Sequence, residues 1–121
     1  MHYASKAYAT AAKETLTPRE LEASLLLKAA AKLQTVHDSW RDTPAGLNEA
    51  LLYNRKLWTV FIDAVTRDDN KLPAQVRQNL ANLGAFVMGE TFSLMTKPKP
   101  EHVESLIRIN RGIAAGLRGK A

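Results

Sequence analysis

Residues that could bind a metal ion are few in this chain, and their spacing does not suit it. The three histidines, His2, His37 and His102, lie far apart, and none has a second histidine or a group of helical carboxylates three or four residues away. Side chains at that spacing share one face of a helix and can reach the same metal ion. The chain has no cysteine, so disulfides and cysteine-based zinc sites are excluded. We expect exposed or capping histidines and no metal or other cofactor.

The sequence also lacks the motifs of nucleophilic catalysis and of phosphate binding. A catalytic serine needs a neighbouring base and an oxyanion hole, and no serine of this chain lies in such a setting. The six glycines are isolated from one another, so no phosphate-binding loop is expected. The acidic residues Glu20, Glu49, Glu90 and Glu104 are typical of helix caps and solvated faces. The sequence therefore predicts a protein that is not an enzyme and acts by binding a partner.

The chain is moderately basic, with 17 Lys and Arg against 12 Asp and Glu, and its net charge is +5. Most charges are scattered, which is typical of a solvated surface. Attraction to nucleic acid or to an acidic protein is the alternative. The exception is the C-terminal segment, where Arg108, Arg111, Arg118 and Lys120 are expected to have no acidic neighbour.

The length of 121 residues suits a single domain, 1–121, and a hydrophobic content of 45% is enough to form a core. The N-terminus lacks the apolar run of a signal peptide. No stretch approaches the roughly 20 apolar residues of a transmembrane helix. We expect a cytoplasmic protein that does not insert into a membrane.

The elements that must position any binding site are helices. Apolar residues recur three and four positions apart between the prolines, and no segment shows sustained alternation. The pattern predicts an all-α bundle of four main helices plus a weaker, alanine-rich N-terminal helix over 3–15. Thr17 and Pro18 are a typical N-cap and first residue of the next helix, whose apolar stripe extends to Trp40. The other helices are expected over 46–67, 73–95 and 101–117.

Each main helix has one apolar stripe that should face the core. In the first it comprises Leu21, Leu25, Ala29, Leu33, Val36 and Trp40. In the second it comprises Leu47, Ala50, Leu51, Asn54, Leu57, Trp58, Phe61 and Val65. In the third it comprises Val76, Leu80, Leu83, Val87 and Leu94, and in the last Val103, Leu106, Ile107, Asn110, Ile113 and Leu117.

Two asparagines interrupt these stripes. Asn54 and Asn110 occupy similar settings, LLYNRKL over 51–57 and IRINRGI over 107–113. A buried asparagine can fix the register of packed helices at some cost in stability. We expect both to be buried structural residues, and Asn54→Leu to preserve or raise stability unless Asn54 belongs to a satisfied network.

The helix over 73–95 has a second apolar stripe, Ala85, Met88, Phe92 and Met95. A helix of a small bundle buries one broad face, so this stripe is surplus. It indicates either a central helix buried on all sides or a groove for a partner helix, for which methionine is well suited. The candidate partner contacts are Phe86, Met88, Phe92 and Met95.

Four segments together resemble the FlaF family of flagellar biosynthesis regulators. They are TPRELEA at 17–23, NRKLWTVFI at 54–62, LPAQVRQNLANLG at 72–84 and IRINRGIA at 107–114. Their order and spacing span nearly the whole chain. None is a catalytic signature, so the resemblance lies in the ensemble.

The resemblance implies a protein of alpha-proteobacterial flagella that acts between flagellin synthesis and export, alongside the translational regulator FlbT. It implies a flagellin-specific chaperone that couples flagellin expression to secretion, without catalytic residues. Unassembled flagellin keeps its terminal segments as unpaired amphipathic helices, which need an apolar groove. The alternatives are an RNA-associated regulator of flagellin mRNA that uses the basic tail, and a structural adaptor in a flagellar regulatory complex.

Overall fold

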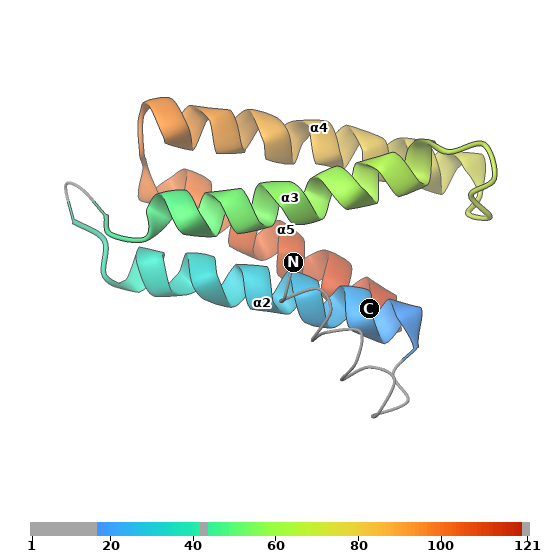
Figure 1. Ribbon diagram of the computed structural model, residues 1–121, viewed down its shortest axis with the longest axis horizontal. Coiled ribbons are helices and arrows are strands. Elements are labelled where there is room, and N and C mark those ends of the chain that lie inside the picture. The colour runs from blue at the N-terminus through green and yellow to red at the C-terminus, as the bar shows by residue number, and fades with distance from the viewer. Residues whose placement is uncertain (1–16, 42–43, 120–121) are drawn as a thin grey trace.

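Four helices make up the computed structural model, which describes residues 17–41 and 44–119 (Figure 1). They are α2 (Pro18–Asp38), α3 (Leu47–Thr66), α4 (Ala74–Thr96) and α5 (Pro100–Leu117). No strand occurs in these two ranges. The all-α prediction is confirmed, and the ends of α3, α4 and α5 lie within one residue of those predicted. The helix expected over 3–15 lies outside the described residues.

The starts of the helices have local causes. Thr17 has an extended backbone, and its Oγ1 accepts a hydrogen bond of 3.1 Å from the Glu20 N–H, so it caps α2 as predicted. Pro100 occupies the first turn of α5, where its missing N–H costs nothing. Gly46 precedes α3 with φ +78°, a left-handed conformation that side-chain-bearing residues rarely adopt. The sequence therefore sets where these helices begin.

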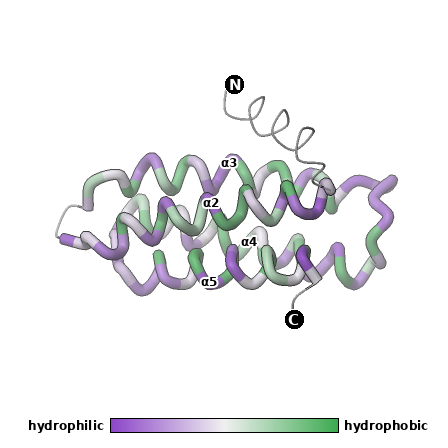
Figure 2. Tube along the Cα trace, turned by 90° about the horizontal axis from the view of Figure 1, so that it is seen from below, coloured by the Kyte–Doolittle hydropathy of each residue, from purple (hydrophilic) through white to green (hydrophobic). Residues whose placement is uncertain are grey.

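The helices form two layers. Figure 1 shows α3 and α4 side by side as an antiparallel hairpin, while α2 and α5 form the other closely packed pair. Of the contacts between the layers, those of α2 with α3 are extensive and those of α4 with α5 are sparse. Hydrophilic and hydrophobic residues alternate along every helix in Figure 2, as expected for amphipathic helices. Since α4 also packs more extensively against α3 than against α5, its position depends mainly on α3.

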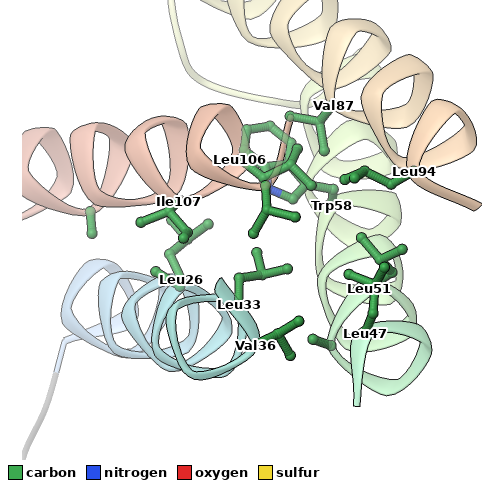
Figure 3. Close-up of a cluster of buried hydrophobic side chains, with 14 of the residues drawn as sticks. Leu26, Leu33, Val36, Leu47, Leu51, Trp58, Val87, Leu94, Leu106 and Ile107 are labelled. Carbon is green, nitrogen blue, oxygen red and sulfur yellow. The ribbon is translucent and has the colours of Figure 1, made fainter. Parts of the chain in front are cut away.

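The core lies between the layers and is built around Trp58. Figure 3 shows Trp58 reaching from α3 towards Leu106 of α5 and Val87 of α4. All three side chains are almost wholly buried. The aromatic ring also makes an edge-to-face contact with Phe61, with 5.9 Å between the ring centroids. The predicted stripes of α3 and α5 are confirmed, because their members are buried or pack against the buried cluster.

Two predicted stripes need correction. In α2, Leu21 and Leu25 are only half-buried, and Ala23 and Leu26 are fully buried instead. The reason is that α2 packs against α3 on one side and α5 on the other, which moves its buried arc towards α5. In α4, Val76 is exposed rather than buried. Few contacts with α5 are available to cover it.

The two predicted asparagines are fully buried and bind each other across the bundle. Asn110 Nδ2 donates a hydrogen bond of 2.6 Å to Asn54 Oδ1 and a longer one, 3.5 Å, to the Leu26 carbonyl. Trp58 Nε1 donates to Asn110 Oδ1 at 2.9 Å. These contacts link α2, α3 and α5. Burial of both asparagines is therefore confirmed, and Asn54 belongs to a hydrogen-bonded network.

Two glycines of α4 differ in what surrounds them. A Cβ at Gly84 would lie 2.5 Å from Ile62 Cγ1 of α3, so the absence of a side chain lets the two helices approach. A Cβ at Gly89 would have nothing within 4 Å. Glycine within a helix costs about 1 kcal/mol relative to alanine. The packing of the bundle explains Gly84 but gives no reason for Gly89.

The network predicts that Asn110→Leu is more harmful than Asn54→Leu. Replacing Asn110 leaves Trp58 Nε1–H and Asn54 without partners, and each buried unsatisfied group costs about 1–3 kcal/mol. We expect the free energy of unfolding in urea to fall by about 2–6 kcal/mol, the sum for these two groups. Asn54→Leu leaves Asn110 Nδ2 with only the longer bond to the Leu26 carbonyl, but it also removes an amide nitrogen that has no partner within the described structure. Because these two effects partly cancel, its loss should be near about 1 kcal/mol. Equal losses, or a gain for Asn54→Leu, would contradict the network.

The two glycines predict opposite effects of the same substitution. Gly84→Ala should lower the melting temperature, because overpacking against Ile62 costs about 1–3 kcal/mol and exceeds the gain in helix propensity. Gly89→Ala should raise the melting temperature, because it gains about 1 kcal/mol without a clash. Thermal unfolding followed by circular dichroism tests both variants. Stabilisation of both would show that the α3–α4 contact tolerates a methyl group.

Candidate partner-binding surface on α4

None of the exposed residues of α4 is charged. Its two charged residues, Arg77 and Glu90, are both half-buried. Arg77 Nη1 donates to the Arg67 carbonyl at 3.0 Å, and Glu90 Oε2 lies 2.6 Å from His102 Nδ1. The exposed residues of α4 are Ala74, Gln75, Val76, Gln78, Asn79, Asn82, Ala85, Phe86, Gly89, Phe92, Met95 and Thr96. Charged residues make up 24% of the chain, so this uncharged face is distinct from the remaining surface.

The C-terminal half of the uncharged face is apolar. Phe86 is 50% exposed, Phe92 68% and Met95 56%. Met88 is half-buried and packs against the core. The interpretation of α4 as a helix buried on all sides is therefore wrong. Three of the four candidate contacts are accessible to a partner, and Met88 lies at the edge between core and surface.

Gly89 lies between the two exposed phenylalanines. It is three residues after Phe86 and three before Phe92, and at about 100° per residue each such step turns about 60° back around the helix. Phe86 and Phe92 therefore stand on either side of Gly89. A Cβ at Gly89 would meet nothing within 4 Å, and the exposed residue one turn before it, Ala85, is also small. A partner helix could approach the backbone there.

The N-terminal half of the uncharged face consists largely of side-chain amides. Gln75 Nε2 donates to Asn79 Oδ1 at 3.0 Å, and Gln78 Nε2 donates to Asn82 Oδ1 at 2.9 Å. All four residues are exposed. Sequence reasoning identifies only the apolar stripe of this helix and misses the amide surface. The sequence does contain a signal for it, because Gln78 to Gly89 is free of charged residues.

His37 and His102 are each paired with a glutamate of another helix. His37 Nε2 of α2 lies 2.9 Å from Glu104 Oε1 of α5, and His102 of α5 is paired with Glu90 of α4. Both histidines are half-buried. The prediction of exposed or solvated side chains is therefore wrong for His37, His102 and Glu90, which are half-buried where they connect neighbouring helices, while Glu104 is exposed as predicted. His2 lies outside the described residues.

The basic segment of α5 is less uniform than expected. Arg108 and Arg111 line an open depression between α2 and α5 together with Glu104 and His37. Arg111 Nη2 also donates to Gln34 Oε1 at 3.3 Å. The expectation that these arginines have no acidic neighbour is wrong, because Glu104 lies in the same depression, one helical turn before Arg108. Lys120 lies outside the described residues.

Other kinds of site are not found in the described ranges. Between residues 17 and 119, leaving aside 42–43, no three His, Asp or Glu side chains gather closely enough to hold a metal ion. None of the helices α2 to α5 has both the length and the apolar character needed to span a membrane. The uncharged face of α4 is thus the feature of this part of the chain that most needs a functional explanation.

Comparison with known proteins assigns the family. The sequence matches the family model described as flagellar protein FlaF over residues 4–117, which is nearly the whole chain. No curated protein and no solved structure matches the sequence. The resemblance noted in the four sequence segments is therefore confirmed. The chain belongs to the FlaF family of flagellar proteins.

Proposed function

We propose that this flagellar protein is a cytoplasmic, non-enzymatic chaperone that binds the terminal helices of flagellin for export and couples flagellin expression to secretion. The observation that carries the proposal is the uncharged face of α4, with Phe86, Phe92 and Met95 exposed on one helix. Depletion of charge and enrichment in aromatic residues and methionine are features of the cores of protein interfaces. An amphipathic helix of unassembled flagellin is a partner that such a surface fits.

The binding energy should concentrate on the exposed apolar residues. Aromatic side chains near the centre of an interface often contribute most of the affinity, and Phe92 is the most exposed large apolar residue of the described structure. Met88 can contribute its accessible edge, because the flexible thioether side chain adapts to the partner. Association with the translational regulator FlbT would then join the chaperone to the control of flagellin expression. That association is part of the proposal.

Regulation by direct RNA contact is the alternative that the basic residues of α5 suggest. The acidic Glu104 beside Arg108 and Arg111 weakens this alternative, because a phosphate backbone would be repelled by the carboxylate. The two functions differ in their response to salt. RNA affinity falls steeply as salt rises through the release of counterions, while burial of an apolar surface depends little on salt. We therefore expect flagellin affinity to change less than about threefold between roughly 50 and 200 mM salt.

Substitution of Phe92 separates binding from stability. Phe92→Gln and Met95→Gln should weaken the calorimetric affinity for flagellin at least about tenfold. The melting temperature should change little, because both side chains are exposed in the free protein. Val60→Gln is the matched control. The exposed fraction of Val60, 64%, is similar to the 68% of Phe92, but Val60 lies on α3. It is two residues, and thus about 160° around the helix, from Ile62, which contacts α4.

Three results would argue against this site. If Phe92→Gln and Met95→Gln both bind flagellin normally, contact is made elsewhere. If both unfold, the two side chains support the fold. If Val60→Gln weakens binding equally, the loss reflects a general change in surface hydrophobicity.

A further inference from the structure

The amide half of the uncharged face has features of a specificity surface. We infer that Gln75, Gln78, Asn79 and Asn82 select a partner helix whose contacting side chains are uncharged and polar, that is, amides and hydroxyls, next to an apolar stretch. The inference deepens the proposed function and rests on it only for the identity of the partner as flagellin. The chemistry of the partner is inferred from the side chains of α4 alone.

The hydrogen-bonding groups of this surface are arranged in two pairs. In each pair the glutamine Nε2 donates to the asparagine Oδ1 four residues later. An amide side chain has two N–H donors and one carbonyl oxygen with two lone pairs. In each pair the glutamine Oε1 and the asparagine Nδ2 make no other hydrogen bond within the described structure. Both kinds of group therefore remain available to a partner that can donate and accept.

Charged partners are disfavoured by the same surface. Burying an ionised side chain is costly unless an opposite charge accompanies it, and none of the exposed residues of α4 supplies one. An amide or hydroxyl in the same place exchanges hydrogen bonds with water for hydrogen bonds with the glutamines and asparagines at little net cost. The surface thus discriminates by rejecting charge as well as by bonding to amides.

The shape of the face favours a helix as the partner. The face follows a single helix, α4 (Ala74–Thr96), about 35 Å long at 1.5 Å per residue. The small residues Ala85 and Gly89 lie along its centre and allow close approach of another backbone. Antiparallel pairing of α4 with a second copy of this chain is a poor match, because it would place Gln75 and Gln78 against Phe92 and Met95, and the sedimentation experiment below tests parallel pairing. The inferred partner is a helix of a different chain, with a polar half and an apolar half of its own.

Two synthetic helical peptides test the partner chemistry without flagellin. Both carry the same leucine stripe and have zero net charge, but the flanking positions are Gln, Asn and Ser in one and Glu and Lys in the other. The full-length chain should bind the amide-flanked peptide at least about tenfold more tightly. The double variant Gln78→Glu/Asn82→Asp should lose this preference while keeping its melting temperature. Ala31→Glu, which adds a charge to an exposed position of α2, should retain it.

Equal affinities for the two peptides, or a preference that survives the double variant, would overturn the inference. So would a dimer of the wild-type chain that the double variant dissociates in sedimentation experiments, because the partner would then be a second copy.

Measuring flagellin binding alongside peptide binding distinguishes a failure of this inference from a failure of the proposed function. Loss of flagellin binding in both Phe92→Gln and the double variant supports both. If Phe92→Gln alone loses flagellin and the peptides bind equally, the specificity surface is refuted and the chaperone proposal stands. If the peptide preference holds but the wild-type chain does not bind flagellin, the specificity surface is supported and the proposed partner is wrong.

Discussion

The hydrogen bonds of Asn110 are the interaction on which the arrangement of the bundle depends. Asn110 contacts Asn54 and Trp58 of α3 and the backbone of α2, although α3 and α5 make no close backbone contact. In an apolar interior, a polar group without a partner costs about 1–3 kcal/mol. Sliding or rotating α3 relative to α5 would separate these groups. The network therefore favours one register between the two layers.

That register determines how α4 is presented. Trp58 and Ile62 lie on the side of α3 that packs against Gly84 of α4. Because the network fixes the rotation of α3 about its own axis, it also fixes the side of α3 on which α4 packs. Val87 and Leu94 then point into the core, and Glu90 meets His102 of α5. With both charged residues of α4 turned inward or towards α3 and α5, the opposite side has only small, apolar and amide side chains. The surface proposed to bind flagellin is thus a consequence of core packing.

Much of the fold could be predicted from the sequence because the apolar period and the caps are local. The stripes of α3 and α5 and the Thr17 cap depend on residues close together in the chain. The buried arc of α2 and the exposure of Val76 could not be predicted, because they depend on which helices become neighbours. Likewise, burial of Asn54 and Asn110 was readable from their stripes. Their mutual hydrogen bond needs the tertiary arrangement of residues far apart in the chain.

The candidate site shows the same division. The surplus apolar stripe identified Phe92 and Met95, but not that Met88 would lie partly in the core. The amide half of α4 could be predicted as a segment without charged residues. That this segment forms an uncharged surface depends on the contacts of Arg77 and Glu90 with other helices and loops, which the sequence does not show. The Glu104 carboxylate that moderates the basic segment of α5 likewise acts through its position beside His37. A charge pattern in the sequence therefore does not by itself predict the charge of a surface, because tertiary packing determines which side chains are exposed.

Site-specific photo-cross-linking in motile cells tests the role of α4 most directly. A benzophenone amino acid would replace Phe92 in one strain and Thr35, an exposed residue of α2, in a matched strain. If the uncharged face of α4 receives flagellin, irradiation should join flagellin covalently to the chain labelled at position 92 and leave the chain labelled at position 35 unlinked. Adducts with flagellin from position 35 alone, or adducts from position 92 that contain no flagellin, would contradict this role.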